Sequence, residues 1–454
     1  MSVVLLVLTC IATALTIRLL QRFPRLVFVA TLLGSIVLLA LLLNASDEPL
    51  SLFGRTLTIA FAGRVFLWPA VGIAAALACF GPLAYEAPND SPTSVIANAQ
   101  GSFFFLSLAL LIVAMALDSF PLAAFLWAVG VMVLILLARP QREGRAGGAA
   151  QFVLLAVIAT ASLLLSSRFL ELYPLSPDNL DLARSAFLFL AWGLGLLLAI
   201  VPLHIWLGPL ADEMPVLGIA FLVGVAQPVG LWLLFQLMTQ VLWLTDKVPL
   251  LDTLLLAGIV MGPAGALLTL AERRHGRFVA YLSLVSLGHA LVGFGLGTRL
   301  ALAGAMLALL NRAIGIALLA GGLTLARYHI EKKWQYIGAF STLVGGLALT
   351  GLPPLLGAAA RWSIYRTLAE PYPLVVGLLL ASDAAALMAL TRVASPLFRD
   401  AFGAVESTGE IKIVPYLCTA VIAVLVAVIV IVGLFPQLVA NPLIATLANA
   451  DYLK

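Results

Sequence analysis

The chain has few charged residues. Only 10 % of its 454 residues are Asp, Glu, Lys or Arg, whereas 63 % are hydrophobic and the mean hydropathy is +1.13. Soluble domains carry about 25 % charged residues, so this chain cannot cover a water-facing surface and is expected to lie in a lipid bilayer. The formal net charge of +4 is spread over short loops without forming a basic patch, which excludes nucleic acid as a partner.

The sequence is also poor in metal-ligating residues. Its three cysteines lie far apart and its four histidines are scattered, with no CxxC pair. This pattern supports neither a disulfide framework nor a zinc, iron–sulfur or other metal site. It holds no nucleotide, flavin or quinone motif either, so we expect no active site in this chain and place any redox cofactor in a partner.

Long apolar runs, by contrast, fill the sequence. Stretches of roughly 18 or more apolar residues, the length that crosses a bilayer, occur about fourteen times. They lie near residues 2–20, 26–43, 66–86, 100–117, 119–138, 151–170, 185–207, 215–240, 250–271, 277–297, 300–325, 338–366, 371–393 and 413–435. We therefore predict an all-α polytopic protein whose residues 1–454 form a single membrane domain.

Basic residues are unevenly divided between the expected loops. Those after odd-numbered spans hold about twice as many Lys and Arg as those after even-numbered spans. The positive-inside rule then places the odd loops in the cytoplasm and both termini on the outer side, in a prokaryotic inner membrane. The odd loops carry Arg22, Arg25, Arg139, Arg142, Arg145, Arg273, Arg274, Arg277, Lys332, Lys333, Arg399 and Lys412.

Proline and glycine interrupt two spans, the seventh at Pro202 and the twelfth at Gly351, Pro353 and Pro354. Because proline removes a backbone donor, each helix should break in mid-membrane and leave carbonyls unpaired. With residues 100–240 and 250–393 as five-helix units, both breaks fall in the fourth helix of a unit, which is the inverted-repeat pattern of transporters. Residues 1–99 would then add three helices, and 394–454 a last helix and tail.

Four motifs in these spans resemble those of one family. They are Pro202-Leu203-His204-Ile205-Trp206-Leu207 with Pro215 after it, Ala280-Tyr281-Leu282-Ser283 after Arg273-Arg274, Asn311-Arg312-Ala313, and Gly351-Leu352-Pro353-Pro354-Leu355-Leu356-Gly357. In this order and spacing they are similar to the antiporter-like membrane subunits of respiratory complex I, of Mrp cation/proton antiporters and of membrane-bound hydrogenases. The resemblance implies an inverted-repeat bundle that carries protons, driven by quinone chemistry in neighbouring subunits.

The family's proton path is a row of buried Glu and Lys residues, most of which this sequence lacks. Counted from the motifs, the position of the family's glutamate is occupied by Ala128. Three positions of its lysines are occupied by Leu197, Gln227 and Ile316. Only Arg361, in the twelfth span, keeps a charge. Ala, Leu, Ile and Gln cannot exchange a proton, so we expect the subunit's own proton path to be degenerate.

A few ionisable groups remain as candidates for ion coupling. His204 follows the first break, and His289 could extend a polar line toward Arg312; either imidazole can instead be a packing group bonded to a carbonyl or serine. Arg312 and Arg361 lie in apolar stretches, where each needs a partner. Asp383, Asp212 and Glu213 are the available acids, and we expect Arg361 to pair with Asp383 across the broken helix.

The sequence therefore favours a membrane-arm subunit of a complex I-like oxidoreductase, in contact with other membrane subunits and the lipid bilayer. Quinone, flavin and iron–sulfur clusters would belong to those partners. Two alternatives stay open. One is a cation/proton antiporter or an inorganic-carbon-uptake subunit, which would need the full titratable row. The other is a purely structural spacer of the membrane arm, which the missing Glu and Lys residues favour.

Overall fold

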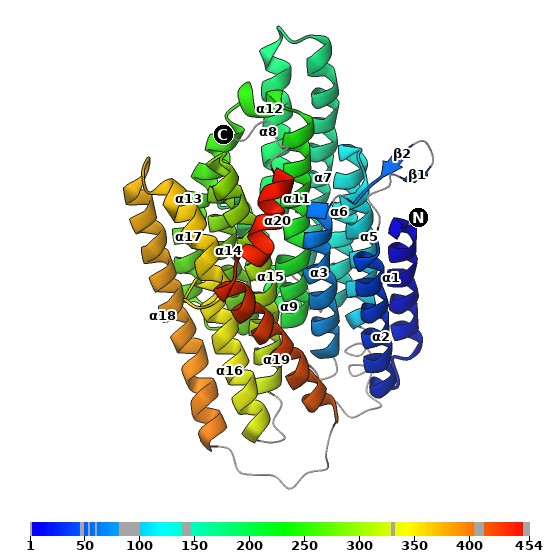
Figure 1. The fold of residues 1–454 in the computed structure, drawn as a ribbon, viewed down its shortest axis with the longest axis vertical. Coiled ribbons are helices and arrows are strands. Elements are labelled where there is room, and N and C mark those ends of the chain that lie inside the picture. The colour runs from blue at the N-terminus through cyan, green and yellow to red at the C-terminus, as the bar shows by residue number, and fades with distance from the viewer. Residues whose placement is uncertain are drawn as a thin grey trace.

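The computed structural model describes residues 2–45, 50–52, 55–59, 61–80, 100–138, 147–327, 332–403 and 413–447. It shows the predicted all-α membrane fold (Figure 1), with helices that run roughly side by side along the long axis. Within these residues, ten helices are long and apolar enough to cross a bilayer, and three shorter apolar helices add to them. Arg139, Arg142, Arg145, Lys412 and the end of the third expected span lie outside the described residues.

The helices follow the expected apolar runs, usually within a few residues. They are α1 (Ser2–Leu19), α2 (Pro24–Leu43), α3 (Phe61–Phe80), α5 (Gln100–Ala116), α6 (Phe120–Val133), η2 (Leu134–Leu137), α7 (Gly148–Leu172), η3 (Tyr173–Leu175), α8 (Leu180–Leu197), η4 (Leu203–Trp206), α9 (Leu207–Glu213), α10 (Val216–Phe221), η5 (Leu222–Ala226), α11 (Gln227–Gln240), α12 (Trp243–Asp246), α13 (Leu250–Ala271), α14 (His275–Gly295), α15 (Arg299–Ala326), α16 (Lys332–Leu349), α17 (Leu356–Leu368), α18 (Pro373–Gly403), α19 (Ile413–Leu434) and α20 (Gln437–Leu447).

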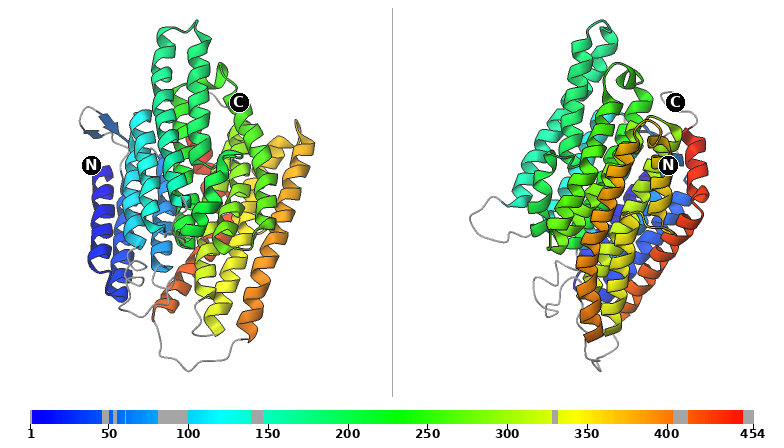
Figure 2. Two further views of the ribbon diagram at one scale, coloured as in Figure 1. Left: turned by 180° about the vertical axis from the view of Figure 1, so that it is seen from behind. Right: turned by 90° about the vertical axis from the view of Figure 1, so that its left-hand side faces the viewer.

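Helices α14, α15 and the α10 to α11 segment form the centre of the bundle. Almost every residue of α14 and α15 is buried, whereas α7, α13 and α18 keep one exposed apolar face, as helices that border lipid do. Figure 2 shows α7 and α8 extending beyond the other helices at one end, and α19 crossing the bundle obliquely. Polar groups on α14 and α15 therefore lie in the protein interior.

Three features depart from the expected pattern. A short antiparallel hairpin pairs β1 (Leu50–Leu52) with β2 (Arg55–Leu57), whereas the sequence predicted helices only. The eighth expected span is divided by a π-helical turn, η5, just before Gln227. The seventh and twelfth spans each end earlier than a continuous apolar run suggests, because the chain leaves the helix at the predicted breaks.

Both breaks begin with the same helix ending. At the end of α8 the N–H of Ile200 donates to the Gly195 carbonyl at 2.9 Å, and at the end of α16 the N–H of Leu352 donates to the Leu347 carbonyl at 3.1 Å. These are the six-to-one bonds of a Schellman motif, which requires a left-handed residue one position earlier. That residue is Ala199 (φ 56°) in the first break and Gly351 (φ 74°) in the second. Pro202 follows in the first break, and Pro353 and Pro354 follow in the second.

Exchanging alanine and glycine at these two positions should have opposite effects. Ala199→Gly relieves about 1–2 kcal/mol of strain from the left-handed backbone. It also loses roughly 0.8 kcal/mol because one buried methyl group is removed. The free energy of unfolding should therefore rise slightly. Gly351→Ala adds that strain, and its new Cβ would collide with the Arg361 side chain. We expect a Tm slightly above wild type for the first variant and clearly below it for the second, measured in detergent. A higher Tm for Gly351→Ala would contradict this account.

Candidate functional site

At both breaks, side chains bind the last carbonyls of the helix; the carbonyls of Leu196 and Ala348 also accept the backbone N–H groups of Ala199 and Gly351. In the first break, the Trp206 indole N–H donates to the Leu196 carbonyl at 2.8 Å, and Gln227 Nε2 lies 3.4 Å from the Leu197 carbonyl. The expectation that these carbonyls stay unpaired is therefore wrong. In a low-dielectric interior an orphaned carbonyl costs more than the ordering of a side chain that reaches it.

The second break is held in the same way, but by a charged group. Asn311 Nδ2 donates to the Ala348 carbonyl at 2.9 Å, and Arg361 Nη2 donates to the Leu349 carbonyl at 2.5 Å. Leu349 ends α16, and Arg361 lies in the second turn of α17, so the guanidinium spans the break. The break therefore fixes a buried cation in place.

Asp383 of α18 supplies the counter-charge. Its Oδ1 lies 3.1 Å from Arg361 Nη2, and both side chains are buried, so the predicted pairing of Arg361 with Asp383 is confirmed. Its Oδ2 accepts from the Tyr365 hydroxyl at 2.9 Å and lies 3.5 Å from His289 Nε2. His289 in turn lies 2.8 Å from the Tyr365 hydroxyl. We call His289, Arg361, Tyr365 and Asp383 the polar cluster.

Arg312 lies outside the polar cluster and has neutral partners. It is fully buried, and its Nη2 donates to Gln227 Oε1 at 2.6 Å and to Ser283 Oγ at 3.3 Å. Its Nε and Nη1 have no hydrogen-bond partner, and among the described residues no carboxylate lies within ion-pair distance. Gln227 therefore links Arg312 to the first break, while Ser283 and Ser286 lie on α14 between it and His289.

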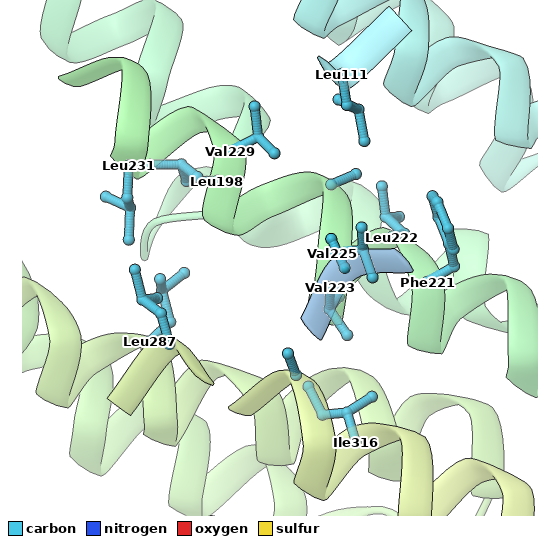
Figure 3. Close-up of a cluster of buried hydrophobic side chains, with 14 of the residues drawn as sticks. Leu111, Leu198, Phe221, Leu222, Val223, Val225, Val229, Leu231, Leu287 and Ile316 are labelled. Carbon is cyan, nitrogen blue, oxygen red and sulfur yellow. The ribbon is translucent and has the colours of Figure 1, made fainter. Parts of the chain in front are cut away.

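The remaining positions of the family row are apolar and fully packed. Ala128, Leu197 and Ile316 are each at most 1 % exposed. Figure 3 shows the apolar interior around η5. In this view Leu287 lies opposite Leu231, and Ile316 lies opposite Val223. The residues at these family positions, together with Gln227 and Arg312, do not exchange protons near neutral pH.

The structure separates His204 from the other candidates. It lies half-buried in η4, and among the described residues no hydrogen bond or ion pair joins it to Gln227, Arg312 or the polar cluster. Reasoning from the sequence missed Tyr365, since a tyrosine in an apolar helix reads as packing or an interface anchor. Its place one helical turn after Arg361 was the available signal.

Asp212 and Glu213 also have other partners than expected. Asp212 accepts from Arg277 Nε at 2.9 Å and Nη2 at 2.5 Å, and Arg274 Nη1 lies 2.9 Å away. Glu213 accepts from the N–H groups of Gly148 at 2.6 Å and Ala149 at 2.8 Å, where α7 begins. These two acids therefore do not neutralise Arg312; they attach α9 to α14 and α7.

Removing the Glu213 carboxylate should destabilise the start of α7. A carboxylate that accepts two N–H groups of a helix's first turn stabilises it by capping and by the helix dipole, about 1 kcal/mol together. We expect Glu213→Ala to lower the free energy of unfolding by that amount in detergent. Glu171→Ala is the matched control, because its contact with Arg168 is exposed and spans 3.6 Å. Equal losses in the two variants would refute the capping role.

The side chains of the polar cluster can hold and move charge. Among the described residues no group of three His, Cys, Asp or Glu side chains could hold a metal ion. The polar cluster combines one fixed cation, one imidazole and one hydroxyl around one acid, Asp383, which contacts all three. Buried groups of this kind in a membrane protein are expensive and point to ion coupling.

Comparisons with known proteins give a family and a fold. The family model described as "NADH:quinone oxidoreductase/Mrp antiporter, TM" matches residues 128–387. A curated relative, NADH-quinone oxidoreductase subunit N of Desulforudis audaxviator, is 31 % identical over 232 residues, which are 47 % of this chain and 45 % of the relative. The match thus spans less than half of that relative's length.

Solved structures agree over nearly the whole chain. A subunit of the membrane-bound sulfane sulfur reductase, an archaeal respiratory membrane complex, superimposes with a TM-score of 0.79 at 17 % identity, covering 100 % of this chain and 98 % of the other. A subunit of respiratory complex I from Thermus thermophilus gives 0.77 at 19 % identity, covering 99 % and 100 %. Similarity at this level of identity establishes the fold alone.

Proposed function

The chain belongs to the NADH:quinone oxidoreductase/Mrp antiporter membrane family, and on this premise we propose that it is a membrane-arm subunit of a complex I-like, redox-driven assembly. Other integral membrane subunits would be its neighbours, and quinone, flavin and iron–sulfur clusters would lie in partners. The structural neighbours support this, since one belongs to an archaeal respiratory membrane complex and the other to respiratory complex I. The chain itself supplies helices and buried charge.

The observation that carries the proposal is the pair of broken helices with side chains bound to the last carbonyls before each break. Both breaks use the same helix ending and hold the carbonyls two and three residues before the left-handed residue. This correspondence supports residues 100–240 and 250–393 as inverted repeats. Irregular backbone at such depth is tolerated only beside protein or a polar path, so the breaks mark where ions would pass.

We further propose that the second unit keeps a coupling role which the first has lost. The first break faces Gln227 and apolar positions, whereas the second holds four ionisable or hydroxyl-bearing groups in contact. Protons would then be carried mainly by sister subunits, with this chain responding to charge at the polar cluster. An intact row would instead have favoured a self-sufficient cation/proton antiporter.

The proposed orientation follows from the distribution of basic residues. Helix α16 begins and α18 ends at the lower end of the bundle in Figure 1, near Lys332, Lys333 and Arg399. Basic loops face the cytoplasm, so this end would be cytoplasmic and the termini outside, in a prokaryotic inner membrane.

Purification of the tagged full chain in mild detergent, followed by mass spectrometry of its companions, tests this function. We expect iron–sulfur, quinone-site and sister antiporter-like subunits to co-purify. Cation-antiporter subunits without redox subunits would replace the proposal with the antiporter alternative. Redox partners combined with unchanged turnover in Arg361→Leu/Asp383→Leu would leave a purely structural spacer, and recovery of the chain alone would refute the assembly.

A further inference from the structure

We propose that His289, Tyr365 and Asp383 form a binding site for a single exchangeable proton, and that the Tyr365 hydroxyl reorients as this proton comes and goes. The proposal deepens the proposed function by locating a proton within the polar cluster, but it rests on hydrogen-bond accounting in this chain and not on the identity of the host complex. The evidence is that three short contacts need three hydrogens, whereas with a neutral imidazole only two are available.

The first contact fixes which nitrogen of His289 carries a hydrogen. His289 Nδ1 lies 2.9 Å from the Val285 carbonyl, one turn back on α14. A carbonyl only accepts hydrogen bonds, so Nδ1 must donate. When the imidazole is neutral, its Nε2 is therefore a bare acceptor.

The second and third contacts then compete for one hydrogen. The Tyr365 hydroxyl lies 2.8 Å from His289 Nε2 and 2.9 Å from Asp383 Oδ2. With a neutral imidazole, both of these atoms are acceptors, and the hydroxyl has a single hydrogen to give. It can donate to only one of them, which leaves the other contact without a proton.

A proton on Nε2 resolves this competition. The imidazolium then donates to the Tyr365 oxygen, and the Tyr365 hydrogen is free to donate to Asp383. All three contacts become hydrogen bonds, and Nε2 gains an ionic interaction with Oδ2, 3.5 Å away. No bond between heavy atoms changes, since the step is the reversible addition of one proton to the imidazole.

The charges around the site are balanced before the proton binds, so one added proton gives the cluster a single positive charge. Asp383 is the one buried acid among the described residues, and Arg361 neutralises it from α17. The other buried polar groups near His289 are the hydroxyls of Ser283 and Ser286 on its own helix, and Arg312 of α15 contacts Ser283. The cluster is thus neutral with an uncharged imidazole and carries one positive charge with the proton bound.

Binding of the proton would also act on the broken helix. Arg361 uses the same Nη2 atom for Asp383 and for the Leu349 carbonyl. When imidazolium shares the carboxylate, Asp383 holds Arg361 less tightly, and the balance moves toward the Leu349 carbonyl. The site therefore links a proton to the polar contact that closes the second break.

Nitrogen-15 NMR of the full chain with labelled histidine, in detergent or nanodiscs between pH 5 and 9, tests the site. The histidine signals that are absent from the spectrum of His289→Gln are assigned to His289. We expect a neutral ring with hydrogen on Nδ1 that becomes doubly protonated on acidification. The protonated form makes two hydrogen bonds through Tyr365 and the neutral form makes one, so Tyr365→Phe should lower the proton affinity by about tenfold. Tyr372→Phe, at an exposed tyrosine, should leave it unchanged.

Three results would overturn the proposal. They are a neutral ring with hydrogen on Nε2, a ring that does not change over this pH range, and the same proton affinity in Tyr365→Phe. Because that variant can misfold, the infrared spectrum of the wild-type chain gives an independent measure: its tyrosine C–O band should shift with the His289 midpoint, and a constant band would count against a moving hydroxyl. Failure to recover redox subunits would refute the host complex and leave these results untouched.

Discussion

Replacing Asp383 with alanine is expected to lower the free energy of unfolding by about 3–5 kcal/mol, because it leaves the buried Arg361 without a counter-charge. The Tyr365 hydroxyl would also lose its acceptor, and His289 would lose the carboxylate that lies 3.5 Å from its Nε2. The measurement is thermal or denaturant unfolding of the purified protein in detergent, read by the loss of helical circular dichroism.

Two further variants show whether the charge is the cause. Arg361→Leu combined with Asp383→Leu removes both charges and should recover much of the lost stability, because breaking a buried ion pair costs more than replacing it by apolar side chains. Asp181→Ala removes the acid of an exposed pair with Arg184, 3.4 Å apart, and should have no measurable effect. If the double variant were as unstable as Asp383→Ala, the loss would come from packing and not from the unpaired cation.

Replacing Arg312 is expected to have the opposite sign. The fully buried guanidinium has neutral partners, and its Nε and Nη1 have no hydrogen-bond partner, so among the described residues no counter-charge offsets its desolvation cost. Arg312→Met with Gln227→Leu should therefore raise the free energy of unfolding, but by less than the about 1–4 kcal/mol found when buried ion pairs are exchanged for apolar side chains, because Gln227→Leu also removes the contact to the Leu197 carbonyl. Arg312→Met alone should gain less, since it leaves the Gln227 amide without that partner.

The functional readout decides why this arginine is present. If its charge matters for coupling, the more stable double variant should lose turnover in the assembled complex, a trade between stability and activity. A variant that is less stable than wild type would show that bound water or an anion already satisfies the guanidinium. A variant with higher stability and full turnover would leave the charge without a coupling role.

The two helix breaks and the Arg361–Asp383 ion pair could be predicted from the sequence for physical reasons. Proline and glycine interrupt a helix wherever they occur, so Pro202 and Gly351 located both breaks to within a few residues. A cation inside an apolar run needs a polar partner, and for Arg361 the acid in the next span, Asp383, supplies it. Such local or obligatory rules transfer directly from sequence to structure.

What could not be read depends on contacts between distant helices or on rare backbone states. The bond from Arg312 to Gln227 joins α15 to α11, and composition alone did not indicate an amide as the partner of a buried cation. Ala199 adopts a left-handed conformation that alanine usually avoids, so its sequence gives no sign of the Schellman ending. Tyr365 was overlooked because its role appears only when α14 and α18 lie beside α17.

The two acids that end α9 have a mechanical consequence. Asp212 is bound to Arg277 at the start of α14, and Glu213 to the first N–H groups of α7, so neighbouring residues anchor the same short helix to opposite halves of the bundle. Tilting α9 would break one anchor or the other. We therefore expect this segment to flex in the non-helical stretch between Leu197 and Leu203, while α9 stays attached to α14 and α7.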